Sequence, residues 1–311
     1  MEKGVKSPKE MSIIEFFEKF GSNEKCRKDL WEKRLKIGFE CPKCNGHIGY
    51  EIAVKYIWQC KNCGHQISLI SGTIFDNTKI GLQKWYLAAF FILYSKNGIS
   101  AKELQHQIRV TYKTAWYINR RIRDAMKTSN DKYKLSGIVT IDEAYFSGRE
   151  NTSKAPKKRG RGTNKSKAIV AVSLNDENNP VYARIQIVDN FKAKTIEKFA
   201  ENYIEKGSKI ITDGFRSYKS QTIKKDYFID YDMLPPDNED SKLKWLHVFV
   251  SNAKAFVLGT FHGLKQHDIQ LYLDEFCYRF NRRYMPNLIF DKFINSAIVT
   301  PPMGYYKSNI S

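Results

Sequence analysis

The spacing of apolar and polar positions between residues 82 and 126 predicts three consecutive helices. The first, over residues 82–95, is almost wholly apolar, and the Lys96-Asn97-Gly98 sequence after it is typical of a helix C-terminus. Ser100 is placed to cap a short second helix over residues 101–108. In a third helix over residues 112–126, apolar positions recur every three or four residues and form one inward stripe, made of Ala115, Ile118, Ile122 and Ala125.

The third helix has a basic and aromatic face. A short helix, a turn and a basic third helix together indicate a helix-turn-helix, in which the last helix enters the major groove of DNA. We therefore predict a helix-turn-helix DNA-binding domain over residues 78–130. Its contacts to phosphates and base edges would come from an outward set of side chains, Lys113, Tyr117, Asn119, Arg120 and Arg121. The pattern also fits an ordinary helical cluster with a solvated basic face.

Beyond residue 135, strand-like and helical segments alternate as in an α/β protein. Short apolar runs predict strands over residues 137–142, 168–174, 181–188 and 209–212. Helical patterns cover residues 195–204, the stretch after Trp245 and residues 268–284. The first and fourth strands are each followed or ended by an acid, Asp142 and Asp213.

The composition is that of a globular protein. The chain has 311 residues, of which 42% are hydrophobic and 14% aromatic, enough for about two domains. No apolar window approaches the length of a membrane span, and the N-terminus lacks the apolar segment of a secretion signal. We expect a soluble protein with no membrane partner, located in the cytoplasm or nucleoid of a prokaryote, or in the nucleus of a eukaryote.

The charge indicates a polyanionic partner. Lys and Arg number 52 against 33 Asp and Glu, a formal net charge of +19. Part of this charge lies in a loop over residues 149–167, whose Pro and Gly residues argue against regular structure. We predict that the loop grips the DNA backbone through Lys157, Lys158, Arg159 and Arg161. A solvated loop or a nuclear-localisation signal is the alternative.

Four of the six cysteines form a metal-binding pattern. Cys41-Pro-Lys-Cys44 and Cys60-Lys-Asn-Cys63 are separated by fifteen residues rich in strand formers. Two such knuckles deliver four thiolates to one Zn²⁺, and a closed four-cysteine site is structural because it leaves no open position. The sequence therefore predicts a structural zinc ribbon over residues 38–73.

Paired acids at neighbouring strand ends indicate a second kind of metal site. Carboxylate oxygens are preferred ligands of Mg²⁺ and Mn²⁺, which support in-line phosphoryl transfer by activating a water or hydroxyl group. Asp142 and Asp213 fit this pattern, although either one alone also suits a turn or a cap.

Nearly the whole chain resembles the zinc-ribbon insertion-sequence transposases, the ISXO-like group related to the Merlin elements. The resemblance rests on the ribbon, the helix-turn-helix, the Lys-Arg-Gly-Arg-Gly loop and four further motifs. These are Ile141-Asp142-Glu143-Ala144-Tyr145-Phe146-Ser147-Gly148, Asp213-Gly214, Leu258-Gly259-Thr260-Phe261-His262-Gly263, and Tyr272-Leu273-Asp274-Glu275-Phe276 with Phe280-Asn281-Arg282-Arg283.

The resemblance implies an RNase H-like, mixed-sheet catalytic domain over residues 135–300, preceded by a helical leader over residues 1–37 and the two DNA-binding modules. It implies a DDE-type triad in which Asp142 and Asp213 are the first two members. The third aligns with His247, where many relatives have Glu, and a basic residue aligns with Lys254. Asn252 and Glu275 remain alternative third ligands, and Glu143 is a candidate for support behind the ligands. A neutral histidine ligand would favour Mn²⁺ over Mg²⁺.

We therefore expect a DNA transposase that binds the terminal inverted repeats of its element, cuts strands with a bound metal ion and joins the freed end to target DNA. Because two ends must be paired, a homodimer or larger assembly on double-stranded DNA is expected. The alternatives are an inactive or domesticated transposase that only binds DNA, and a metal-dependent nuclease with no joining step.

Overall fold

A computed structural model describes residues 9–147, 165–214, 218, 221–235, 238, 240–261 and 264–302. The chain divides into two compact units. One unit combines Met1–Thr128 with Tyr284–Ser311, and the other is Ser129–Arg283. The basic residues Lys157, Lys158, Arg159 and Arg161 of the predicted DNA-gripping loop lie outside the described residues.

The first unit is mainly helical, and the three of its helices whose starts were predicted begin at the predicted residues, Leu82, Ala101 and Tyr112. The helices of this unit are α1 (Ile13–Phe20), α2 (Asn23–Ile37), α3 (Leu82–Tyr94), α4 (Ala101–Ile108), α5 (Tyr112–Asn130) and α10 (Ile289–Val299). The Ser100 hydroxyl accepts the Glu103 N–H at 3.1 Å and caps α4 as predicted. The four residues of the predicted inward stripe on α5 are all fully buried.

Helix α10 packs with the N-terminal helices, not with the region 135–300 in which the sequence analysis placed it. The Phe290 ring stacks on Phe20 at 5.2 Å and meets Phe16 and Tyr86 edge-on at 6.0 and 5.8 Å. Such aromatic pairs bury large apolar areas. The α10 sequence is as compatible with one apolar partner as with another, so only the tertiary structure assigns it to this unit.

A three-stranded antiparallel sheet follows α2. Its strands are β1 (Gly49–Ile52), β2 (Ile57–Cys60) and β3 (Gln66–Ser68), in the order β1-β2-β3, with the short helix η1 (Ala53–Lys55) between the first two. Trp58 of β2 packs edge-on against Trp31 of α2 at 5.6 Å. Arg34 of α2 donates to the backbone carbonyls of Ser68 and Ser71. Side chains of α2 therefore hold the small sheet in place from one side.

The second unit is built on a five-stranded mixed sheet. The strands β4 (Ile138–Phe146), β5 (Ser166–Leu174), β6 (Pro180–Val188), β7 (Lys209–Thr212) and β8 (Phe228–Tyr231) lie in the order β6-β5-β4-β7-β8. The pairs β6-β5 and β5-β4 are antiparallel, whereas β4-β7 and β7-β8 are parallel. Three antiparallel strands continued by two parallel ones form the RNase H-like arrangement, which confirms the predicted fold class.

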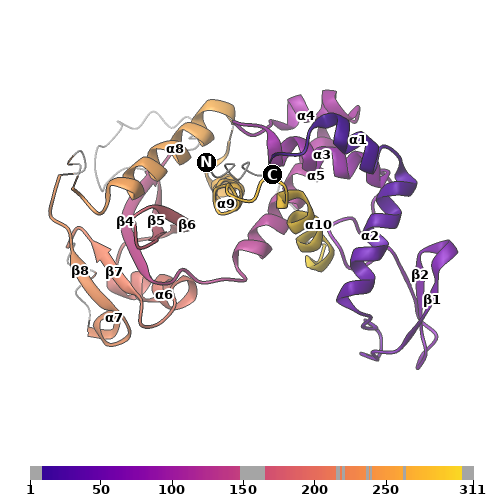
Figure 1. The fold of residues 1–311 in the computed structure, drawn as a ribbon, viewed down its shortest axis with the longest axis horizontal. Coiled ribbons are helices and arrows are strands. Elements are labelled where there is room, and N and C mark those ends of the chain that lie inside the picture. Colours follow the sequence, from indigo (N-terminus) through magenta and orange to yellow (C-terminus); the bar gives the residue numbers. More distant parts are fainter. Residues whose placement is uncertain are drawn as a thin grey trace, which may run out of the picture. The chain divides into compact units, whose positions relative to one another are not determined.

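Helices cover both faces of this sheet, as Figure 1 shows. Helices α8 (Lys244–Thr260) and α9 (Ile269–Phe280), with η4 (Gln266–Asp268) before α9, lie over one face. Helices α6 (Ala193–Tyr203) and α7 (Gln221–Asp226) lie over the other. Because side chains alternate along β4, Ala144 and Phe146 enter the α8–α9 core while Val139 and Ile141 enter the α6–α7 core.

Strand β4 continues beyond its predicted end. The prediction ended it at Asp142, but the strand extends to Phe146 and pairs with β5 along its whole length. Pairing with the antiparallel strand β5 stabilises residues 143–146 as a strand. The mixed polar and apolar sequence of these residues did not predict this. Asp142 consequently lies in the middle of β4.

Helix α9 occupies the outer edge of β6. Its Gln270 side chain accepts the Ile187 N–H at 2.7 Å and donates to the Ile185 carbonyl at 3.0 Å. Asn281, which follows the helix, bonds both the N–H and the carbonyl of Ala183, at 2.7 and 3.1 Å. These amides satisfy backbone groups that an edge strand otherwise leaves unpaired.

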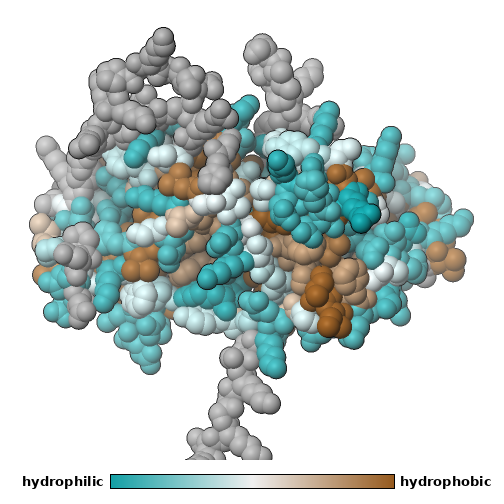
Figure 2. Space-filling model, turned by 90° about the horizontal axis from the view of Figure 1, so that it is seen from above, coloured by the Kyte–Doolittle hydropathy of each residue, from teal (hydrophilic) through white to brown (hydrophobic). Residues whose placement is uncertain are grey.

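The visible face in Figure 2 is mostly hydrophilic, with apolar side chains confined to separate patches. Within the described ranges, every helix falls short of the length and apolarity of a membrane span.

Candidate functional site

Two carboxylates meet where β7 ends beside β4. Thr140 of β4 is level with Ile211 of β7 in the parallel register. Continued by two residues, this register sets Asp142 beside Asp213, and adjacent strands lie about 4.8 Å apart. Since β7 stops at Thr212, the described residues give β4 no strand partner on that side from this point onward. Asp142 therefore faces an opening in the sheet although it lies in mid-strand.

Helix α8 brings His247 to this opening. Its apolar side chains Leu246, Phe249 and Ala253 pack on the sheet. This packing sets the His247 Nδ1 atom 3.8 Å from Asp142 Oδ2, with the two side chains 31% and 21% exposed. Lys254 lies seven residues further on, on the same side of the helix. Three of the predicted site residues and this lysine thus converge.

The electrostatics of Asp142 reflect this crowding. Burial is the largest influence and raises the pKa of the Asp142 carboxyl, and the nearby Asp213 raises it further. The Glu143 N–H, which donates to Asp142 Oδ1 at 2.7 Å, opposes this rise in pKa, as do His247 and Lys254. Asp142 is partly buried and Asp213 is exposed; two neighbouring like charges repel each other, and a bound cation relieves this repulsion.

By residue type this donor set suits a divalent cation, although its ligand atoms do not form a group as compact as that of the four ribbon sulfurs described below. Two carboxylates and an imidazole are ligands that Mg²⁺ or Mn²⁺ accept, and the mutual repulsion of the two acids, with the partial burial of Asp142, favours a cation between them. The alternative ligands are placed differently. Asn252 is exposed on α8, and Glu275 is fully buried on α9 with its Oε1 3.7 Å from Arg279 Nη1.

The four cysteines of the ribbon converge on one point. Their sulfur atoms all lie within 4.8 Å of one another, the only such group of potential ligands among the described residues. Cys41 Sγ is 3.6 Å from Cys63 Sγ, and Cys44 Sγ is 3.6 Å from Cys60 Sγ. A tetrahedral Zn²⁺ with Zn–S bonds of about 2.3 Å requires sulfurs about 3.8 Å apart. The spacing therefore fits zinc, and it is far too long for disulfides.

Backbone geometry at both knuckles supports thiolate ligands. Asn45 and Gly64 each follow the second cysteine of a knuckle and have φ of 54° and 69°, so the chain turns sharply there. N–H groups of Cys63 and Asn62 point at the Cys60 sulfur and lower the pKa of Cys60 to about 7, against the opposing effect of burial. The Gly46 N–H likewise lowers the pKa of Cys44, but hydrogen bonds with the other three thiols outweigh it and raise that pKa to about 12. A thiolate is the form that binds metal.

The exposed face of α5 differs from the predicted one. Lys113 is exposed, Tyr117 and Arg120 are half-buried, and the Arg120 guanidinium lies over the Trp116 ring at 5.6 Å. Asn119 and Arg121 are buried instead, so the prediction of an outward position was wrong for both. Asn119 is four residues after Ala115 and shares its inward stripe. Arg121 donates to the carbonyls of Ile74 and Asp76 at 2.6 and 2.8 Å.

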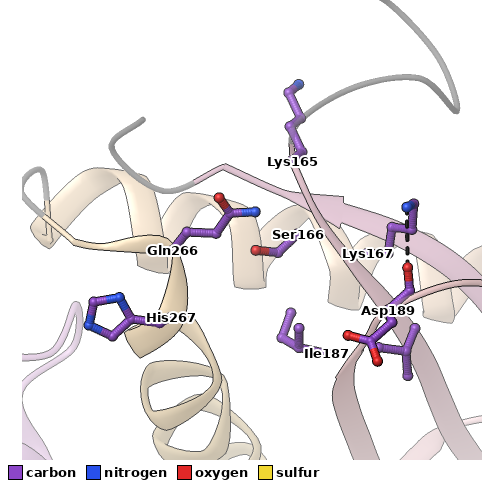
Figure 3. A pocket seen from close by; sticks show the side chains of 8 residues that line it. Lys165, Ser166, Lys167, Ile187, Asp189, Gln266 and His267 are labelled. Carbon is purple, nitrogen blue, oxygen red and sulfur yellow. Dashed lines mark hydrogen bonds between the residues drawn. The ribbon is translucent and has the colours of Figure 1, made fainter. Parts of the chain in front are cut away.

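A separate pocket of about 600 Å³ lies where β5 begins and β6 ends. Figure 3 shows Lys165 and Lys167 on one side of it and Gln266 and His267 of η4 on the other. Lys167 Nζ donates to the Asp189 carbonyl at 3.2 Å. Ser166, in the wall of this pocket, pairs with Phe146 of β4. Phe146 is four residues along β4 from Asp142, so these two positions lie about 13 Å apart.

Sequence reasoning missed two residues of interest. The first is Trp116 on α5, whose side chain is 41% exposed. Its apolar character alone did not indicate which way it points. Tyr218 is buried close to the carboxylates, and burial raises its pKa well above the usual range, with further contributions from Glu143, Asp142 and Asp213. Its position five residues after Asp213 was the available signal.

Comparison with known proteins gives consistent matches. Residues 134–281 match the family model described as ISXO2-like transposase domain, and residues 21–66 match the one described as transposase zinc-ribbon domain. A protein in the transposable element ISH50 of Halobacterium salinarum (strain ATCC 700922 / JCM 11081 / NRC-1) is 27% identical over 217 residues. That match covers 64% of this chain and 70% of the relative.

Among solved structures, the catalytic domain of Mos1 mariner transposase is 14% identical, with a TM-score of 0.28, over 60% of this chain and 95% of that one. The Mos1 strand transfer complex gives 12% identity and a TM-score of 0.27, over 70% of this chain and 78% of that one.

Proposed function

Because the chain belongs to the IS1595-type zinc-ribbon transposases, we propose that it binds the terminal inverted repeats of its own element, cleaves strands there and joins them to target DNA. The observation that carries this proposal is the convergence of Asp142, Asp213 and His247 at the end of β7, with His247 Nδ1 3.8 Å from Asp142 Oδ2.

In this proposal Asp142, Asp213 and His247 would hold Mg²⁺ or Mn²⁺, and the ion would supply the Lewis acidity for phosphoryl transfer. The Glu143 N–H fixes one oxygen of Asp142 and leaves Oδ2 facing His247. Lys254 is an exposed cation on the same side of α8 and binds a phosphate of the strand being cut. A water molecule first hydrolyses the strand, and the freed 3′-hydroxyl then attacks target DNA.

DNA is held by surfaces of both units. Lys113 and Arg120 on the exposed face of α5 contact phosphates and base edges, with Tyr117 beside them. The ribbon, folded around Zn²⁺, contributes to recognition of the element ends. Lys165 and Lys167, at the end of the basic loop, also bind the DNA backbone. Pairing of two ends requires a dimer or larger assembly.

The test uses purified protein and DNA that carries the element's own ends, with Mg²⁺ or Mn²⁺. Wild type is expected to cleave and join, whereas Asp213→Asn and His247→Ala are expected to do neither. Asn252→Ala is the matched control, because Asn252 is exposed on the same helix. If Asn252→Ala loses activity and His247→Ala keeps it, Asn252 and not His247 is the third metal ligand. Binding without cleavage in wild type would favour the DNA-binding alternative, and cleavage without joining would favour a nuclease.

A further inference from the structure

Tyr218 is a buried phenol whose hydroxyl has no hydrogen-bond partner in the described part of the chain. Its side chain is 1% exposed and packs in the α6–α7 core with Ile141, Ile196 and Ile223. Buried hydroxyl groups nearly always have a partner, so an orphan calls for an explanation. The explanation lies in what surrounds it.

Three carboxylates act on the Tyr218 hydroxyl, and they are those of the acidic cluster. Besides burial, Glu143, Asp142 and Asp213 each raise the pKa of the phenol, and Glu143 has the largest effect of the three. A phenol with a strongly raised pKa keeps its proton at neutral pH. It is therefore a hydrogen-bond donor, and alternation along β4 places one of these acids, Glu143, on its face of the sheet.

Tyr218 approaches the cluster from the face opposite His247. Val139 and Ile141 of β4 share the core of Tyr218, so by alternation Glu143 points to that face and Asp142 to the α8 face. His247 contacts Asp142 from α8. The carboxylates thus have the imidazole on one side of the sheet and the phenol on the other.

We propose that Tyr218 is a positioning residue: once the catalytic cation is bound, its O–H, which is unpaired in the described part of this structure, donates a hydrogen bond to one of the carboxylates of Asp142, Glu143 and Asp213 and fixes the orientation that binds the cation. The proposal rests on the proposed function of the cluster. Hydrogen bonds behind metal ligands orient them, and their loss usually costs about 10- to 100-fold in metal affinity or activity.

Tyr218→Phe removes only the hydroxyl and keeps the ring in its core. We expect Mn²⁺ affinity, followed by electron paramagnetic resonance on zinc-loaded protein, to fall by about 10- to 100-fold. The melting temperature without Mn²⁺ should stay the same or rise, because an unpaired buried hydroxyl is lost. Cleavage should need correspondingly more Mn²⁺ and recover when the ion is in excess.

Tyr227→Phe is the matched control. Tyr227 is buried in the same core, and its hydroxyl donates to the Ile204 carbonyl at 3.5 Å. This variant should leave Mn²⁺ affinity unchanged. Combining Tyr218→Phe with Glu143→Gln tests whether Glu143 accepts the bond. If it does, the double variant should bind Mn²⁺ no less tightly than the single variant with the lower Mn²⁺ affinity.

Wild-type Mn²⁺ affinity in Tyr218→Phe would overturn the proposal, as would a melting temperature that falls together with affinity. If wild type binds Mn²⁺ but Asp142→Asn and Asp213→Asn bind it equally well, the ion is elsewhere and the proposed site fails along with the role of Tyr218. If those two variants lose Mn²⁺ while Tyr218→Phe keeps it, only the role of Tyr218 fails.

Discussion

Asp124 on α5 imposes a stability cost that depends on pH in a calculable way. The residue is 5% exposed, and its Oδ2 atom finds no hydrogen-bond partner among the residues described. Burial is the largest influence and raises the pKa of Asp124 from 3.8 to about 6, although Arg120, Lys127, Arg121 and Arg123 act to lower it. The folded protein therefore holds this proton more tightly than the unfolded chain does.

The size of the effect follows from this shift. The folded pKa exceeds the unfolded value by roughly 2 units, and each unit is worth about 1.4 kcal/mol, so ionised Asp124 costs about 3 kcal/mol of unfolding free energy above pH 7. The sign is that of an acid with a raised pKa: stability falls as pH rises from about 4 to 6 and then levels off. At pH 5 the cost is about half as large, and below pH 4 it disappears.

The perturbation is Asp124→Asn, which keeps the shape and removes the charge. We expect a higher unfolding free energy by about 3 kcal/mol at pH 8 and by about half of that at pH 5. Denaturant unfolding followed by circular dichroism at the two pH values measures this. Asp176→Asn, in the exposed turn after β5, is the control. A gain that is the same at both pH values, or a loss at pH 8, would refute the reasoning.

Three further predictions address the ribbon, the basic pocket and the start of α8. A chelator should release one Zn²⁺ per chain and speed amide hydrogen exchange in β1–β3, while the amides of β4 and β5 keep their protection. If the ribbon amides also keep their protection, the metal is not structural. Changing both Lys165 and Lys167 to Ala should reduce the slope of log affinity for DNA against log salt by about 2, since each phosphate contact contributes about 0.9. Lys206→Ala, which removes an exposed lysine paired with Asp226, should leave that slope unchanged, and equal slopes for both variants would exclude the pocket from binding. Asp232→Ala should lower stability by about 2 kcal/mol near neutral pH, because this carboxylate accepts the Lys242 and Leu243 N–H groups and the Ser241 hydroxyl just before α8. Burial raises the pKa of Asp232, but these hydrogen bonds outweigh it and lower the pKa overall, so the difference between wild type and variant should fade as pH falls below about 4; a difference that persists there would contradict this account.

Local sequence signals predicted the parts of the molecule that depend on local chemistry. The two Cys-x-x-Cys knuckles and the stripe of Ala115 and Ile118 are encoded by spacing alone, and the structure reproduces both. The register that sets Asp142 beside Asp213 was implied by their strand positions, although the strand end assigned to Asp142 was wrong.

Tertiary contacts determined what the sequence did not reveal. Arg121 is buried because the carbonyls of Ile74 and Asp76, far away in the chain, require donors. Tyr218 could be related to the site only from the tertiary structure, which packs it in a core near Asp142 and Glu143 of β4 and Asp213 after β7. Strand β8 was not predicted because its four residues, Phe228–Tyr231, carry no periodicity that distinguishes them from a loop.

The amide side chains of Gln270 on α9 and of Asn281 just after it also limit how this chain can change in length. Gln270 and Asn281 are eleven residues apart, about three helical turns, so both amides face β6. One residue inserted or deleted between them would rotate one amide by about 100° and strip an edge strand of its partners. The exposed turn between β5 and β6 has no such coupling. Length variation among relatives should therefore accumulate in that turn, while the eleven-residue interval stays fixed even where the residues inside it change.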